Sequence, residues 1–136
     1  MTRINLVHPS ELCDQHLFAE FREITRIPNL ILSNRFNFHN QPSEYTLGKG
    51  HVKFFYDKLD FLHKRYASLW VELTCIRQYN VIYIHAFAEV YRQHLFSLWD
   101  DYIPNDNAVE LSKSRIIERM PNNAKYTNRN PPQWSN

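Results

Sequence analysis

The residues best suited to chemistry lie near the start of this 136-residue chain. Thr2 directly follows Met1, and methionine is usually removed before a residue as small as threonine, which exposes an α-amino group on Thr2. Such an amine has a pKa of about 7.7–8.0, so a useful fraction is neutral near physiological pH. Neutral amines attack carbonyl-like carbons and form Schiff bases, which divide one difficult step into two easier ones. Thr2 is therefore a candidate nucleophile.

A helix is predicted to follow this residue, with Ser10 as its N-cap. At about 100° per residue, one face of the helix is apolar and the other carries a carboxylate between two arginines. The members of the polar face are Gln15, Ala19, Arg22, Glu23 and Arg26. Taken alone, this spacing is more typical of a solvated salt-bridge network on an ordinary amphipathic helix, and a residue such as Thr2 is more typical of a frayed terminus.

Several segments, taken in order, resemble the pyrimidine-dimer DNA glycosylase and AP lyase family of the phage endonuclease V type. In the first third they are Thr2-Arg3-Ile4-Asn5-Leu6, Asp14-Gln15-His16-Leu17, Ala19-Glu20-Phe21-Arg22-Glu23 and Arg26. Further along they are Gly50-His51-Val52, Phe54-Phe55-Tyr56-Asp57-Lys58-Leu59 and Asp101-Tyr102-Ile103-Pro104. The resemblance extends to about Arg119, and its first third is the most specific part.

The resemblance implies a DNA repair enzyme that needs no cofactor and no metal. The N-terminal amine that this family uses, here that of Thr2, would attack C1′ of the 5′ nucleotide of a cyclobutane pyrimidine dimer. Glu23 would stabilise the cation that develops. β-Elimination from the Schiff base would then nick the strand. The partner would be double-stranded DNA containing UV photoproducts or abasic sites. By residue-by-residue matching, its DNA contacts would be Arg3, Gln15, Arg22, Arg26, Arg115, Arg119 and Lys125.

The C-terminal stretch departs from the family pattern. Relatives carry several aromatic residues after the proline that corresponds to Pro121, whereas this chain continues Asn-Asn-Ala before Lys125 and Tyr126. Since that aromatic tail is tied to lesion specificity in the family, two alternatives stay open. One is an AP lyase or glycosylase of broader or different lesion specificity, and the other is a non-catalytic helical DNA-binding protein.

Length and composition indicate an all-α protein in which residues 1–136 form one compact domain with long loops. An apolar stripe predicts a long central helix over residues 51–79, and weaker helical spacing predicts another over 81–99. A helix over 108–120 should place Ser112, Arg115 and Arg119 on one face. Pro28 should end or kink the first helix, and one helical turn is expected near 30–36. Residues from about 121 to 136 are expected to form an extended basic tail.

Net charge, cysteine spacing and hydrophobic segments indicate the environment in which the protein works. The net charge of +2 is only mildly basic, although lysines and arginines gather after residue 111. Cys13 and Cys75 have no metal-binding spacing and are interpreted as buried free thiols in a reducing compartment. No signal peptide or membrane span is apparent, so we expect a soluble, cytoplasmic, monomeric protein that associates with the nucleoid through DNA.

Overall fold

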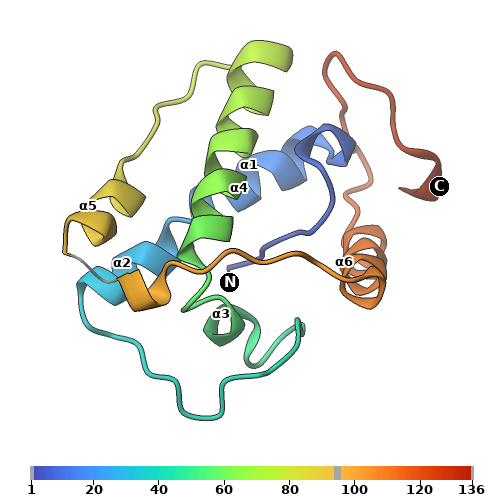
Figure 1. Ribbon diagram of the computed structural model, residues 1–136. Coiled ribbons are helices and arrows are strands. Elements are labelled where there is room, and N and C mark those ends of the chain that lie inside the picture. Colours follow the sequence, from blue (N-terminus) through green and yellow to red (C-terminus); the bar gives the residue numbers. More distant parts are fainter. Residues whose placement is uncertain (1, 94–95, 136) are drawn as a thin grey trace.

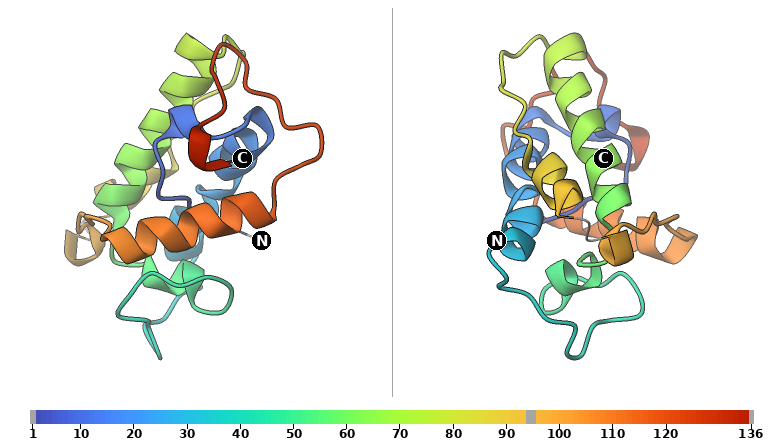
Figure 2. Two further views of the ribbon diagram at one scale, coloured as in Figure 1. Left: turned by 90° about the vertical axis from the view of Figure 1, so that its right-hand side faces the viewer. Right: turned by 60° about the vertical axis from the view of Figure 1, so that its left-hand side comes forward.

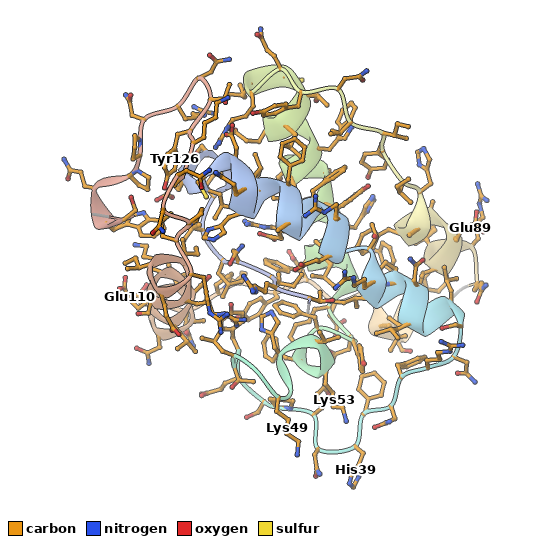
Figure 3. All side chains as sticks on the ribbon, turned by 180° about the vertical axis from the view of Figure 1, so that it is seen from behind. His39, Lys49, Lys53, Glu89, Glu110 and Tyr126 are labelled. Carbon is orange, nitrogen blue, oxygen red and sulfur yellow. The ribbon has the colours of Figure 1, made fainter. Side chains whose placement is uncertain are left out.

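The computed structural model describes residues 2–93 and 96–135, and within these ranges it confirms the all-α prediction, since no strand occurs. The α-helices are α1 (Asp14–Glu23), α2 (Arg26–Leu32), α3 (His51–Phe54), α4 (Leu59–Val71), α5 (Ala86–Arg92) and α6 (Asp106–Glu118). A π-helical turn, Glu72–Ile76, extends α4. In Figure 1, α4 runs through the middle of the molecule with α5 and α6 on opposite sides. Figure 3, seen from behind, shows α1 and α2 on the near face.

The apolar stripe predicted for a central helix is buried, but the single long helix over residues 51–79 was wrong. A turn separates α3 from α4, and the helical part ends with the π-helical turn. Phe54, Phe55 and Tyr56 are all buried. Three consecutive side chains cannot all enter the core from one helix, because successive residues point about 100° apart. The break between α3 and α4 therefore allows a larger aromatic core than a continuous helix would.

The first helix begins later than predicted, so Ser10 is not its N-cap. Ser10 lies in a short 3₁₀ turn, and α1 begins at Asp14. The buried Arg77 guanidinium donates to the carbonyls of Pro9 and Leu12 at 3.2 and 2.7 Å. The Pro9 carbonyl also accepts the N–H of Leu12 at 3.1 Å, which closes the 3₁₀ turn, whereas the Leu12 carbonyl is bound by Arg77. A charged partner distant in sequence thus delays the start of α1.

The first helix ends before the proline that was expected to end or kink it. α1 ends at Glu23, and α2 begins at Arg26 after a break of two residues. Pro28 lies in the first turn of α2, where its missing N–H has no intrahelical partner to lose. α2 replaces the single turn predicted near residues 30–36. A long loop then leads to α3.

The helix predicted over residues 81–99 was wrong for its first part, which is extended, and α5 is shorter than predicted. Side chains of α4 satisfy the backbone of this extended part. Trp70 donates its indole N–H to the carbonyl of Val81 at 3.2 Å, and the Tyr66 hydroxyl accepts the N–H of Ile84 at 2.9 Å. A local helix would forfeit both contacts. Residues 94 and 95 of the predicted helix lie outside the described residues.

The two cysteines are free thiols in different environments. Cys13 is buried beside the start of α1, as predicted, and burial raises the pKa of its thiol. Cys75 is exposed, so its predicted burial was wrong. It lies in the π-helical turn after α4, two residues after the buried Leu73, and positions two apart on a helix face nearly opposite sides.

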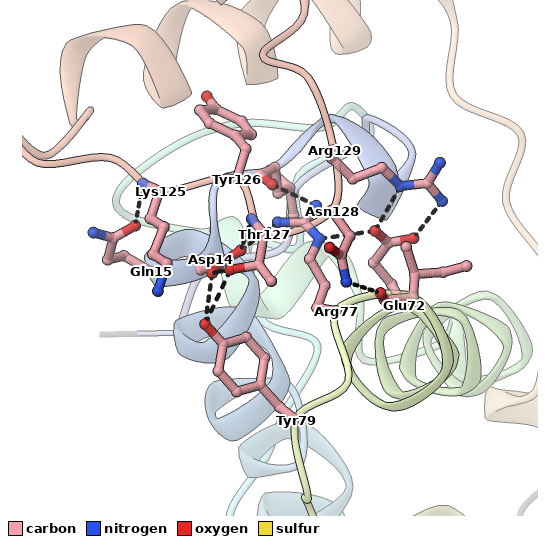
Figure 4. A network of polar contacts seen from close by, with 12 residues as sticks. Asp14, Gln15, Glu72, Arg77, Tyr79, Lys125, Tyr126, Thr127, Asn128 and Arg129 are labelled. Atoms are coloured by element: carbon pink, nitrogen blue, oxygen red, sulfur yellow. Dashed lines mark hydrogen bonds and ion pairs between the residues drawn. The ribbon is translucent and has the colours of Figure 1, made fainter.

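The C-terminal tail lies over the beginning of α1, as Figures 2 and 4 show. The backbone N–H of Asp14 donates to the carbonyl of Lys125 at 2.6 Å. The Asp14 carboxylate in turn accepts the N–H and the hydroxyl of Thr127 at 3.1 and 2.5 Å. Arg129 donates twice to Glu72, at 3.0 and 2.9 Å. The tail is thus attached to both α1 and the end of α4.

This attachment predicts a loss of stability in acid. Burial raises the pKa of the Asp14 and Glu72 carboxyls, but hydrogen bonds from tail and core outweigh it and leave both pKa values below their ordinary range. A carboxyl whose pKa is depressed by folding stabilises the fold fully above its unfolded pKa of about 4, and this contribution is lost as pH falls through the folded pKa. We expect the unfolding temperature to fall below about pH 4. Glu72→Gln should unfold at a lower temperature at pH 7 and show a shallower pH dependence; an unchanged pH profile in this variant would contradict the prediction.

Candidate active site

The N-terminal segment brings Thr2 to the end of α1. Thr2 is only 9% exposed, and the backbone N–H of Arg3 donates to Oε1 of Glu23 at 3.1 Å. Consecutive residues are about 3.8 Å apart between Cα atoms, so the amine of Thr2 lies within one residue of this hydrogen bond. The carboxylate and the candidate amine are thus neighbours. Met1, whose removal we expect, lies outside the described residues.

A small cavity opens beside Glu23, between the N-terminal segment, α1 and α6. Its volume is about 20 Å³. It is lined by Arg3, Asn5, His16, Ala19, Glu20, Glu23, Arg115, Ile116 and Arg119. A space of this size admits a water molecule, whereas a nucleobase requires far more room. A larger substrate would therefore be bound at the mouth of the cavity.

Three of the predicted DNA-contacting arginines meet at this cavity. Arg3 comes from the N-terminal segment, while Arg115 and Arg119 share one face of the end of α6, as their spacing predicts. Burial lowers the pKa of the Arg115 guanidinium, and the charges of Arg3 and Arg119 lower it further. Guanidiniums that repel one another in this way are stabilised by an anion placed between them. Their planar donors suit the oxygens of a phosphate group.

The other predicted contacts lie outside the cavity. Arg22 and Arg26 are exposed, on α1 and at the start of α2. Gln15 lies at the opposite end of α1, where its amide donates to the carbonyl of Asn123 at 2.8 Å and accepts the N–H of Lys125 at 3.1 Å. Lys125 itself is exposed. Gln15 thus pairs with the tail backbone, and its predicted contact with DNA stays a prediction.

A buried ion pair next to the site was not predicted from the sequence. Glu20 is 1% exposed and accepts two hydrogen bonds from Arg65, at 2.7 and 2.9 Å. Asn5 donates a third bond to Glu20 at 2.8 Å. The position of Glu20, one helical turn before Glu23, could have suggested that both carboxylates lie near the site. No sequence pattern indicated that Arg65, which is distant in the chain, would be the partner of Glu20.

His16 also lines the cavity without having been assigned a role. Its Nε2 lies 3.0 Å from the carbonyl of Arg119, an arrangement that requires a proton on Nε2. Burial lowers the pKa of His16, and the charge of Arg3 acts in the same direction. The lowered pKa favours the neutral imidazole, and the bond to the Arg119 carbonyl fixes the end of α6 against α1.

Two further findings concern metals and membranes. Within residues 2–93 and 96–135, no group of three or more histidine, cysteine, aspartate or glutamate side chains is arranged to hold a metal ion. In the same ranges, no helix combines the length and the apolar character needed to cross a bilayer. The side chains that line the cavity include three arginines, Arg3, Arg115 and Arg119, whose guanidiniums suit an anionic ligand.

Comparison with known families agrees with these features. A model of the family described as pyrimidine dimer DNA glycosylase matches residues 1–87 of the 136-residue chain. The matched part includes Thr2 and Glu23 and ends within α5, so that α6 and the tail lie beyond it. Because the match covers more than half of its length, this chain belongs to the pyrimidine dimer DNA glycosylase family.

Proposed function

We propose that this DNA repair glycosylase acts through the amine of Thr2 on the 5′ nucleotide of a cyclobutane pyrimidine dimer and then nicks the strand by β-elimination. The observation that supports the proposal most directly is the hydrogen bond from the Arg3 N–H to Glu23 at 3.1 Å. This bond sets a carboxylate beside the residue whose amine would attack. The family relationship supports the glycosylase step.

In the first step, the lone pair of the neutral amine forms a bond to C1′ while the glycosidic C1′–N bond breaks. The base leaves with the electron pair of that bond and takes up a proton. Opening of the sugar ring at C1′–O4′, with a proton delivered to O4′, gives a protonated imine. The Glu23 carboxylate stabilises the cationic carbon as charge develops, and the interaction therefore lowers the barrier rather than only tightening binding.

In the second step, the imine accepts electrons. The protonated imine takes up the electron pair of the C2′–H bond as C2′ loses its proton, which gives an enamine. That pair then forms a C2′–C3′ double bond while the C3′–O bond breaks, and the 3′ phosphate leaves with the electron pair of the broken bond. Glu23 accepts the N–H of Arg3, the residue next to Thr2, and would move protons during ring opening and elimination. The cavity is too small for a base, so the sugar would react at its mouth, with Arg3, Arg115 and Arg119 holding the flanking phosphates.

A lyase with broader lesion specificity is a second candidate, favoured by the aromatic residues of the tail. Trp134 donates its indole N–H to Glu11, and the Lys113 ammonium lies 5.5 Å from its ring centroid. Tyr126 is partly buried and directs its hydroxyl to the sulfur of Met120 at 3.8 Å. Both rings already pack against the protein, which favours a tail less suited to reading a dimer.

The experiment that tests the proposal is borohydride trapping on duplexes that carry either a dimer or an abasic site. We expect a covalent adduct on both duplexes with protein whose mass confirms removal of Met1. A variant with one glycine inserted before Thr2 displaces the amine by one residue and should trap far more slowly. Adducts on the abasic duplex alone would support the broader lyase. Duplex binding with no adduct on either would leave a non-catalytic DNA-binding protein and overturn the proposal.

A further inference from the structure

The N-terminal segment that carries Thr2 is extended, yet no strand of the described residues pairs with it. Its backbone groups are instead satisfied by side chains from elsewhere in the chain. The pairs are Arg3 N–H with Glu23, Ile4 N–H with His51, Ile4 carbonyl with Tyr45, Leu6 N–H with Ser112, and Val7 carbonyl with Arg65. Buried backbone groups need such partners, and here each partner also fixes where the segment lies.

Ile4 is held on both of its backbone polar groups. Its N–H donates to Nε2 of His51 at 2.9 Å, and its carbonyl accepts the Tyr45 hydroxyl at 2.8 Å. His51 is 3% exposed and Tyr45 is 7% exposed, so water does not replace either bond readily. On its other side, His51 contacts the carbonyl of Thr46 through Nδ1 at 2.7 Å. The imidazole must therefore carry its proton on Nδ1 and leave Nε2 as the acceptor.

The loop before α3 is built to hold these two side chains in place. Gly50 adopts a φ of +90°, and a Cβ at this position would lie 2.8 Å from Cγ of Pro42. Only glycine suits both constraints, because L side chains rarely adopt such a conformation. The ring of Tyr45 packs edge-on against that of His51, with centroids 5.3 Å apart. The tight turn at Gly50 thus allows Tyr45 and His51 to pack together against the N-terminal segment.

We propose that Tyr45 and His51 are positioning residues that hold the Thr2 amine at the Glu23 carboxylate. Their bonds fix Ile4, and the intervening Arg3 then keeps its N–H on Glu23. The inference rests on the proposed function, in which Thr2 is the nucleophile. Displacement of a reacting group by about 1 Å can cost roughly a hundredfold in rate, so loss of either bond has a kinetic effect beyond stability.

The bond from Ile4 also requires a neutral His51. Charged or titratable groups face this imidazole from three elements: Tyr45 from the loop, Glu20 from α1 and Arg115 from α6. Burial lowers the pKa of His51, and Arg115 lowers it further, while the Thr46 carbonyl and Glu20 act in the opposite direction. The net shift is downward, so the acceptor is present above the ordinary histidine pKa of about 6.5 and is lost as pH falls through the lower folded value.

The test compares single-turnover trapping rates on an abasic duplex, with duplex affinity and folded fraction measured in parallel. Tyr45→Phe removes one hydroxyl. His51→Asn keeps a donor for Thr46 but does not reach Ile4, whereas the longer His51→Gln restores an acceptor near Nε2 and does not titrate. Tyr66→Phe is the matched control, because it also deletes the hydroxyl of a buried tyrosine that is bonded to the backbone: the Tyr66 hydroxyl accepts the N–H of Ile84, whereas that of Tyr45 donates to the carbonyl of Ile4.

We expect Tyr45→Phe and His51→Asn to trap roughly ten- to a hundredfold more slowly at unchanged duplex affinity, and His51→Gln to recover much of the rate. Tyr66→Phe should lose stability but not rate. The ratio of wild-type to His51→Gln rates should be constant above about pH 6.5 and fall in more acidic solution. If the glycine insertion slows wild-type trapping, but the folded Tyr45→Phe and His51→Asn variants react at the wild-type rate, the positioning role is wrong and the proposed function still stands. If wild-type trapping is indifferent to the glycine insertion, the proposed function itself fails.

Discussion

Replacing Glu23 with glutamine is expected to lower the rate of glycosidic cleavage by roughly 10²–10⁴-fold. The amide oxygen of glutamine can still accept the Arg3 N–H, so the N-terminal segment should stay in place. What is lost is the negative charge that faces the developing cation and the group that can move a proton. Duplex affinity should not fall, because the substitution removes an anion from a surface that binds phosphates.

The appropriate control is Glu118→Gln. Glu118 lies at the end of α6 with Oε1 3.9 Å from Nε of Arg119, and its side chain is exposed. This change removes the same charge near the same basic face, but outside the cavity, and should leave the cleavage rate close to that of the wild type. Single-turnover cleavage of a dimer-containing duplex, at enzyme concentrations above the dissociation constant, separates chemistry from binding. A Glu23→Gln variant that cleaves at the wild-type rate would rule out the role assigned to Glu23.

Replacing Arg77 with methionine is expected to lower the free energy of unfolding by about 3–5 kcal/mol. The Arg77 side chain is fully buried. It pairs with Asp14 at 2.6 Å and with Glu72 at 2.9 Å, as Figure 4 shows. Methionine has a similar length and no donors, so two buried carboxylates would lose a cationic partner. The carbonyls before α1 would lose theirs as well.

Urea denaturation followed by circular dichroism measures this effect directly. Arg92→Met serves as the control, because Arg92 pairs with Glu89 on the surface and both side chains are exposed. Exposed pairs contribute little, so this control should differ from the wild type much less. Combining Arg77→Met with Asp14→Asn should cost less than the sum of the single changes, since no charge at position 14 is then left uncompensated. Equal stability of the Arg77→Met and Arg92→Met variants would contradict the structural role of Arg77.

Features that depend on neighbouring residues could be predicted from the amino-acid sequence. The helical spacing in residues 108–120 correctly predicts α6, which spans Asp106–Glu118, and the shared face of Arg115 and Arg119 follows from the same periodicity. The apolar stripe identified the buried side chains of α4. The motif around Glu23 allowed a nucleophile and a carboxylate to be named together, and the family match includes both.

Contacts between residues far apart in the chain could not be predicted in this way, because they depend on how the helices pack. Glu20 pairs with Arg65 across 45 positions of sequence, and the Tyr45 hydroxyl reaches the carbonyl of Ile4 across 41. Other contacts of this kind compete with local hydrogen bonds: Trp70 and Tyr66 bind the backbone of Val81 and Ile84 in a segment that is not helical, and Arg77 binds the Leu12 carbonyl before the late start of α1. Local periodicity reports which face of a segment is apolar. It does not report which distant side chain will satisfy a buried backbone group, and here those side chains position the N-terminus.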